Sequence, residues 1–335
     1  MTESRTPLDG VDLILADLDG VIYKGADAIP YAVEAINRAQ QSTRVGYITN
    51  NASRTDAAVA DHLSGLGLTV AATDVVTSPQ AAIRLLAGLV GPGSTILVVG
   101  GEGLTHEVEN GGFQVTRSAL DDPAAVIQGF SPEVGWPQLA EAAFALQGEN
   151  AERPWIATNT DWTIPVARGT APGNGTLVSA VHTAIGRLPL VAGKPETPMF
   201  ELAVERFGAE HAIVIGDRLD TDILGANRAG LESVHVLTGI DGVKQVLAAA
   251  PDQRPTYIVS DLRELHEPYP MPTNEETRDG IVTTSGGARV LRRGEVLEVV
   301  STGDRPIDLV RAGAAAIWSS GLAIYALTVP SELYS

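Results

Sequence analysis

Short apolar runs alternate with amphipathic stretches along most of the chain. The run VDLILADLD, residues 11–19, has the length of a buried strand, and IPYAVEAINRAQ, residues 29–40, has the apolar spacing of a helix. TRVGYITNN, residues 43–51, is a second strand that ends on polar residues, and residues 53–67 follow it as a helix with a serine or threonine cap. Two strand–helix units in succession predict an α/β fold with a doubly wound parallel sheet.

A second group of strands and helices interrupts this sheet. Its predicted strands include STILVVGG, AAVIQGF and PWIATNTD, and the first sheet resumes with LPLVAGKPETPMF and AIVIGDRLDTDI. The pattern predicts a core at residues 8–80, an inserted α/β domain at 81–188, the second part of the core at 189–267, and a small C-terminal α+β domain at 273–335.

The C-terminal part begins with PYPMPTNEETRDG, which its prolines and polar residues predict to be a linker. Two hairpin strands, ARVLRRG and EVLEVVS, are expected next, then the helix RPIDLVRAGAAAIWSSG and a last strand, AIYALTV. Two interpretations stay open. In the first, this segment has a structural role and packs on the core or makes a dimer contact. In the second, it is a regulatory or ligand-sensing module.

The amino-acid composition of the chain limits the classes of partner and of chemical site that it can have. The 335 residues, 44% of them hydrophobic, exceed one usual domain, and the formal charge of −18 without a Lys/Arg block excludes nucleic acid and anionic membranes. The absence of cysteine excludes disulfides, thiolate nucleophiles and zinc–sulfur sites. With no signal-peptide pattern and no membrane-length apolar run, we expect a cytoplasmic protein. The sequence allows a homo-oligomer but does not fix the assembly.

Polar side chains follow the predicted strands at the points where the strands end. Because the carboxyl ends of parallel strands meet at one edge of a sheet, we expect these side chains to lie close together. Clustered carboxylates repel, so a cation or a proton must sit among them, and oxygen-only ligands favour Mg²⁺. The lysine, hydroxyl and amides suit a tetrahedral anion. The residues are Asp17, Asp19, Thr49, Asn50, Asn51, Lys194, Asp217 and Asp222.

These residues stand in motifs that resemble those of the haloacid dehalogenase (HAD) superfamily of phosphatases. DLDGV, TNN, GKP and GDRLDTDI resemble its four motifs, in family order and each at the end of a predicted strand. Each motif alone has an ordinary explanation as a turn, a helix cap or a solvated loop, but all four in order favour catalysis. The chain is most similar to the branch that contains nitrophenylphosphatase and the phosphoglycolate, pyridoxal phosphate and glycerol 3-phosphate phosphatases, above all the actinobacterial glycerol 3-phosphate phosphatases. In that branch a C2-type α/β cap is inserted between the second and third motifs, where residues 81–188 lie here.

The resemblance implies a Mg²⁺-dependent phosphomonoester hydrolase that works through an aspartyl-phosphate intermediate. In this mechanism Asp17 is the nucleophile, and Asp19 is the general acid and base, with its backbone carbonyl also on the metal. Asp17 and Asp217 bind Mg²⁺, and Asp222 holds the metal's waters.

The remaining motif residues are implied to bind the phosphoryl group. Thr49 and the neighbouring amides of Asn50 and Asn51 contact its oxygens, and Lys194 balances the charge on Asp17 and on the phosphate.

Substrate choice is expected to lie in the cap, because the core contacts only the phosphate. Asp161, Trp162 and Arg168 are the candidates to contact the leaving group. An enclosing cap predicts a small phosphorylated metabolite, and the resemblance favours glycerol 3-phosphate, then 2-phosphoglycolate, then pyridoxal phosphate. A non-catalytic sensor of a phosphorylated ligand is the alternative, ranked lower because the full catalytic set is present.

Overall fold

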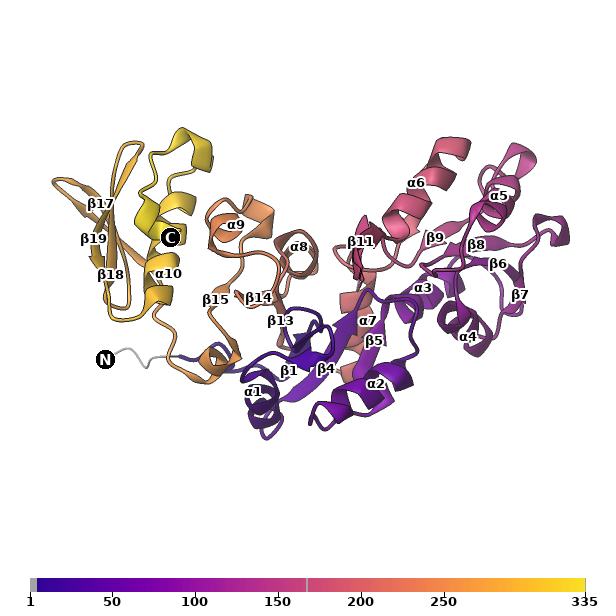
Figure 1. Ribbon diagram of the computed structural model, residues 1–335, viewed down its shortest axis with the longest axis horizontal. Helices are drawn as coiled ribbons and strands as arrows, with labels where there is room; N and C mark the ends of the chain where they lie inside the picture. The colour runs from indigo at the N-terminus through magenta and orange to yellow at the C-terminus, as the bar shows by residue number, and fades with distance from the viewer. Residues whose placement is uncertain (1–4, 167, 335) are drawn as a thin grey trace. The chain divides into compact units, whose positions relative to one another are not determined.

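A computed structural model describes residues 5–166 and 168–334 of the chain (Figure 1). The chain forms two compact units. Unit 1 consists of Met1–Val45 and Ala209–Ser335, and unit 2 consists of Gly46–Gly208. The division into four segments that the sequence predicts stays a prediction.

Unit 1 contains a parallel sheet in the strand order β15-β14-β13-β1. All four strands are short, and β1 and β13 are apolar and buried along their whole length, as expected for parallel strands that are covered on both faces. The elements of this part are β1 (Leu13–Ala16), β2 (Tyr23–Lys24), β3 (Asp27–Ala28), α1 (Ala32–Ala39), β13 (Ala212–Gly216), α8 (Leu224–Arg228), β14 (Glu232–Val236), α9 (Val243–Leu247) and β15 (Tyr257–Val259).

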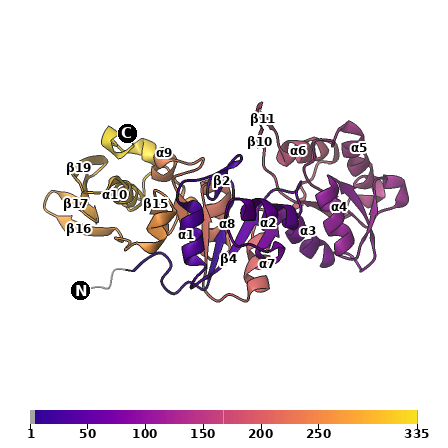
Figure 2. The same ribbon diagram turned by 60° about the horizontal axis from the view of Figure 1, so that its bottom comes forward.

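The C-terminal part of unit 1 is an antiparallel sheet of four strands in chain order, and α10 (Pro306–Trp318) packs against one of its faces (Figures 1 and 2). Apolar side chains of this part, among them Val290 and Ile317, share one core cluster with Ile223 and Ile258. The C-terminal part is therefore packed against the preceding segment of unit 1 through a shared hydrophobic core. The strands are β16 (Thr273–Thr277), β17 (Gly280–Ser285), β18 (Ala288–Arg293) and β19 (Val296–Thr302).

Two expectations for this part are wrong. The polar stretch expected to be a linker forms β16 at Thr273–Thr277, because it pairs in register with β17 as an exposed edge strand. The segment expected to be the last strand is not one: Ile324–Ala326 is a 3₁₀ turn, and after it Thr328 forms an isolated bridge with Val296.

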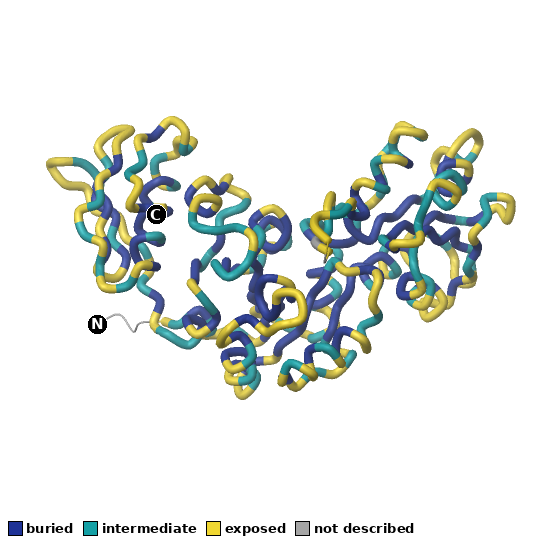
Figure 3. Tube along the Cα trace, viewed as in Figure 1, coloured by how far each residue is buried: buried dark blue, intermediate teal, exposed yellow. Residues whose placement is uncertain are grey.

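Unit 2 contains a parallel pair, β4–β5, and a five-stranded parallel sheet in the order β12-β9-β8-β6-β7. The central strands of this sheet are buried, while its helices carry buried, intermediate and exposed residues (Figure 3). The strands are β4 (Arg44–Thr49), β5 (Val75–Thr77), β6 (Thr95–Val99), β7 (Gln114–Thr116), β8 (Ala125–Gln128), β9 (Trp155–Ala157), β12 (Leu190–Val191) and the antiparallel hairpin β10 (Thr163–Val166) and β11 (Gly169–Pro172).

Helices connect these strands, as the alternating pattern predicts. The expected hydroxyl cap is confirmed at Thr55, whose Oγ1 accepts a hydrogen bond from the backbone N–H of Ala58 at 3.2 Å. None of the helices in the described residues has the length and apolar character needed to cross a lipid bilayer. The helices of unit 2 are α2 (Asp56–Gly65), α3 (Ser78–Ala87), α4 (Glu102–Asn110), α5 (Trp136–Ala145), α6 (Asn174–Ile185) and α7 (Pro198–Phe207).

Candidate active site

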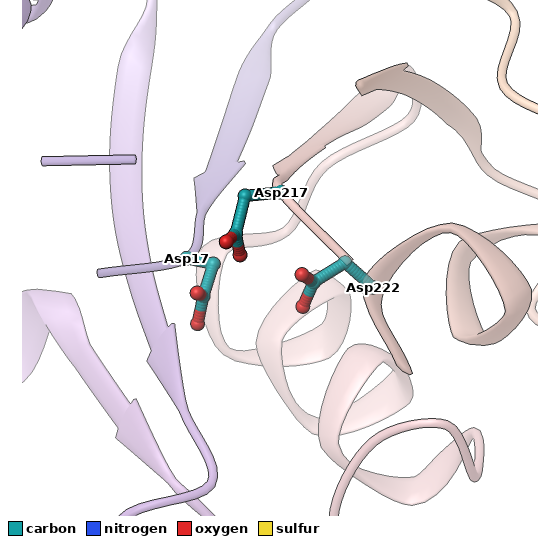
Figure 4. Close-up of side chains that lie close together, drawn as sticks. All are labelled: Asp17, Asp217 and Asp222. Carbon is teal, nitrogen blue, oxygen red and sulfur yellow. The ribbon is translucent and has the colours of Figure 1, made fainter. Parts of the chain in front are cut away.

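Three aspartates of unit 1 converge on one small volume (Figure 4). One carboxylate oxygen each of Asp17, Asp217 and Asp222 lies within 4.8 Å of the others, and all three residues are buried. Their convergence follows from the sheet, because β1 and β13 are parallel neighbours and Asp17 and Asp217 are the first residues after them. Asp222 is carried by a π-helical turn, Leu219–Ile223, directly before α8.

Backbone groups hold these carboxylates in place. Oδ2 of Asp217 accepts a hydrogen bond of 2.7 Å from the N–H of Ile240, and Oδ2 of Asp222 accepts one of 3.1 Å from the N–H of Arg218. Gly20 has φ +83°, a left-handed conformation that favours glycine, and a Cβ added there would fall 2.2 Å from Oδ2 of Asp217. The positions of the carboxylates are therefore determined by close backbone packing.

The chemistry of this cluster fits a divalent cation. Three buried carboxylates repel one another strongly, and a cation bound among them would offset that repulsion. The donors are all carboxylate oxygens, the ligands that the hard Mg²⁺ ion prefers. Asp19 belongs to the same unit, two residues beyond Asp17, and it is exposed. An exposed carboxyl at this position can exchange protons with solvent and substrate.

In unit 2 the predicted site residues gather around the loop that follows β4. Thr49 ends the strand and is buried, and its Oγ1 accepts a hydrogen bond of 3.1 Å from the N–H of Asn51. The side-chain oxygen of Asn51 accepts from the N–H and the hydroxyl of Ser53, at 2.9 and 2.7 Å. Asn51 therefore uses its acceptor inside the loop.

Lys194 and Asp161 both bind the side chain of Asn50. The backbone N–H of Lys194, a buried residue, donates to Asn50 Oδ1 at 2.9 Å, and Nδ2 of Asn50 donates to Asp161 Oδ1 at 3.1 Å. Two other cap candidates differ from Asp161, because Trp162 is 66% exposed and Arg168, directly before β11, is exposed as well.

The predicted residues thus form one group in each unit. Unit 1 holds the four aspartates Asp17, Asp19, Asp217 and Asp222, and unit 2 holds Thr49, Asn50, Asn51, Asp161, Trp162, Arg168 and Lys194. Their roles, and their assembly into one site, stay predictions.

Sequence reasoning missed the residues that support these groups. Asp241 follows β14, and its carboxylate accepts a hydrogen bond of 2.7 Å from the N–H of Leu219, directly after the Asp217 segment. Asn159 donates from Nδ2 to the carbonyl of Asn50 at 2.7 Å. The available signals were the turn sequence TGIDG after a strand and the second polar residue of ATNTD.

Comparison with known proteins identifies the family. The model of the haloacid dehalogenase-like hydrolases matches residues 14–114, and a related HAD-hydrolase-like model matches residues 191–265. The D-glycerol 3-phosphate phosphatase of Mycobacterium tuberculosis is 44% identical over 92% of this chain and 86% of its own length. The chain therefore belongs to the haloacid dehalogenase-like hydrolases, which confirms the resemblance seen in its motifs.

Within this family the protein is a phosphatase. Chronophin from Rattus norvegicus is 34% identical over 76% of this chain and 86% of its own. A crystal structure of a glycerol phosphate phosphatase from M. tuberculosis in complex with magnesium matches with a TM-score of 0.85 and 41% identity, covering 96% of this chain and 94% of the other. The p-nitrophenyl phosphatase of Archaeoglobus fulgidus matches with a TM-score of 0.70 and 25% identity over 76% and 98%. These matches confirm the α/β fold class and the enzyme class.

Proposed function

We propose that this phosphatase hydrolyses glycerol 3-phosphate and that Mg²⁺ is its cofactor. The observation that supports this metal-dependent reaction is the convergence of Asp17, Asp217 and Asp222 at the ends of parallel strands. The substrate rests on the similarity to the D-glycerol 3-phosphate phosphatase of M. tuberculosis, which extends over 92% of this chain.

Asp17, Asp217 and Asp222 are the residues that would hold the metal. When bound, Mg²⁺ offsets negative charge, so that an anionic carboxylate can approach an anionic phosphate ester. The buried positions of the three carboxylates support this assignment, because a low-dielectric surrounding strengthens their attraction for a cation.

Catalysis then needs two displacements at phosphorus. The carboxylate of Asp17 attacks, a bond forms between its oxygen and phosphorus, and the bond from phosphorus to the glycerol oxygen breaks. Asp19 donates its proton to the departing alkoxide, and glycerol leaves. Asp19, now a carboxylate, takes a proton from water, which attacks the aspartyl-phosphate and releases orthophosphate and the carboxylate of Asp17.

The group in unit 2 supplies phosphate binding and substrate choice. The hydroxyl of Thr49, the backbone N–H groups of the loop after it and the ammonium of Lys194 would bind the phosphoryl oxygens. Asp161, Trp162 and Arg168 remain the candidates to contact the glycerol moiety.

The test is phosphate release from glycerol 3-phosphate, 2-phosphoglycolate and pyridoxal phosphate, each with and without Mg²⁺. We expect Mg²⁺-dependent release with preference for glycerol 3-phosphate, and a loss of at least about 1,000-fold in Asp17→Asn, since this variant lacks the nucleophile. Asp252→Asn, which neutralises an exposed carboxylate of unit 1, is the matched control and should keep native activity.

Comparable turnover of all three esters would refute the substrate assignment. If no ester is hydrolysed while a phosphorylated ligand still binds, the protein is a sensor and the proposed reaction is wrong. The cytoplasmic location stays a prediction, and the oligomeric state stays open.

A further inference from the structure

The side-chain amide of Asn50 forms a closed pair of hydrogen bonds with the backbone of Lys194. Its Oδ1 accepts from the N–H of Lys194 at 2.9 Å, and its Nδ2 donates to the carbonyl of the same residue at 3.1 Å. The amide thus binds Lys194 as a neighbouring strand would, and it fixes both peptide groups that flank the Lys194 side chain.

The second hydrogen of Nδ2 goes to the cap candidate Asp161. The distances from Nδ2 are 3.1 Å to Oδ1 and 3.4 Å to Oδ2 of that carboxylate. A primary amide has two N–H donors, and here one is used by Lys194 and the other by Asp161. The side chain of Asn50 consequently has no donor left for a phosphoryl oxygen.

The orientation of this amide is determined by its partners. A flipped amide would set N–H against the N–H of Lys194 and place its oxygen against both the Lys194 carbonyl and the Asp161 carboxylate. The fit is also tight, because a Cβ added at Gly193 would lie 2.6 Å from Oδ1 of Asn50.

The backbone of Asn50 is anchored as well. Its carbonyl accepts hydrogen bonds from Oγ of Ser78 at 2.8 Å and from Nδ2 of Asn159 at 2.7 Å. Oδ1 of Asn159 in turn accepts from the N–H of Asp161 at 3.2 Å. The segment from Asn159 to Asp161 is therefore attached to Asn50 twice, once through each end.

We propose that Asn50 is a positioning residue that holds Lys194 and Asp161 in a fixed mutual arrangement, and that its side chain is not a phosphate ligand. The catalytic consequence rests on the proposed function, since it requires Lys194 to act on the phosphoryl group. Misplacement of a charged group by about 1 Å can lower a rate by about 100-fold.

The structural part is tested without any substrate. The chain has three lysines, Lys24, Lys194 and Lys244, so ¹⁵N-labelled lysine gives one backbone amide signal for each, assignable through Lys24→Arg and Lys244→Arg. In Asn50→Ala we expect hydrogen exchange at the Lys194 amide to accelerate at least about tenfold, because its acceptor is gone, with Lys24 and Lys244 unchanged. Asn110→Ala, at the exposed end of α4, is the control and should change none of the three.

Native exchange at Lys194 in Asn50→Ala would overturn the inference. Equal acceleration of exchange at all three lysines would also overturn the inference. It would show that Asn50→Ala destabilises the fold globally and that Asn50 does not position Lys194 locally.

The catalytic part is tested by a double-mutant cycle of Asn50→Ala and Lys194→Ala on kcat with glycerol 3-phosphate. We expect Asn50→Ala alone to lower kcat about 100-fold, and to lower it no more than about twofold in the Lys194→Ala background, because it acts through that lysine. The Mg²⁺ concentration for half-maximal activity should stay native, since the aspartate cluster is untouched. Independent, multiplying effects would overturn the inference.

The two proposals can fail separately. If the native protein releases no phosphate, the proposed function is wrong, and the amide exchange of Lys194 alone decides whether Asn50 positions it. If the native enzyme is active but the cycle is additive, the positioning role is wrong and the function stands.

Discussion

Gly239 lies directly against the carboxylate of Asp217. A Cβ atom on Gly239 would fall 1.9 Å from Oδ2 of Asp217 and 2.3 Å from its Cγ, far inside van der Waals contact. The next residue, Ile240, donates its N–H to the same oxygen at 2.7 Å. The loop after β14 therefore packs its bare backbone against this acid and orients it, as outer-shell groups do for metal ligands.

We predict that Gly239→Ala displaces Asp217 and weakens metal binding. The added methyl group cannot fit without moving either the carboxylate or the backbone that hydrogen-bonds to it. The Mg²⁺ concentration for half-maximal phosphate release should rise at least about tenfold, the range measured for outer-shell changes. A Mg²⁺ titration of activity, with thermal unfolding followed in parallel, measures this.

Gly242→Ala is the matched control in the same loop. The nearest atom to a Cβ at this position is Oε1 of Gln245 at 3.7 Å, an ordinary contact, so the Mg²⁺ dependence should stay native. A native Mg²⁺ titration in Gly239→Ala as well would show that this packing does not position Asp217.

The ends of the core strands were predictable because the signal is local. Apolar runs that stop at a polar residue mark β1 before Asp17, β4 at Thr49 and β13 before Asp217, and the structure ends each strand there. A run of buried residues fixes the strand, and a parallel sheet then sends its carboxyl ends to one edge.

Other features depend on partners far away in sequence. TNEET at Thr273–Thr277 has no apolar alternation, and it is a strand only because β17 offers it a pairing edge. AIYALTV has the composition of a strand but forms a 3₁₀ turn at Ile324–Ala326. The close contact between Gly239 and Asp217 could not be predicted from the sequence either, since one glycine in a turn sequence does not show which residue its backbone will contact.

Burial lowers the pKa of His235 below its usual value of 6.5. The residue is fully buried in β14, and its Nε2 donates to the carbonyl of Asp241 at 2.8 Å. Its Nδ1 has no hydrogen-bond partner among residues 5–166 and 168–334. The unfolded chain therefore takes up a proton at a higher pH than the folded chain does. The stability contribution is fully present above pH 6.5 and is lost as the pH falls below that value toward the folded pKa.

We predict that His235→Gln makes the loss of stability at low pH smaller, because glutamine keeps an N–H donor but does not titrate. Urea unfolding between about pH 7 and about pH 5 should show a shallower fall of the unfolding free energy in the variant than in the native protein. His106→Gln, on the exposed face of α4, is the control. Equal slopes for native protein and His235→Gln would contradict a buried neutral histidine.

Arg311 of α10 lies in a buried ion-pair cluster that binds the C-terminal part to the preceding segment of unit 1. Its guanidinium donates to Asp308 Oδ1 at 3.1 Å, to Glu264 Oε2 at 2.5 Å and to the carbonyl of Ile258 at 2.9 Å, and its side chain is 1% exposed. Removing only the cation leaves two buried carboxylates without their main partner, which is far more costly than the loss of a surface pair.

We predict that Arg311→Met lowers the free energy of unfolding by about 3 kcal/mol, since methionine fills part of the volume but leaves Asp308 without this cation and Glu264 with only the partly exposed Arg305 at 3.3 Å. The matched control is Arg293→Met, which breaks an exposed pair with Glu298 at 3.0 Å and should change stability by less than about 1 kcal/mol. Urea unfolding measures both. Because Arg311 lies in the C-terminal part, remote in sequence from the catalytic motifs, kcat at low temperature should stay native. Equal effects of the two substitutions would mean that the cluster does not hold the C-terminal part in place.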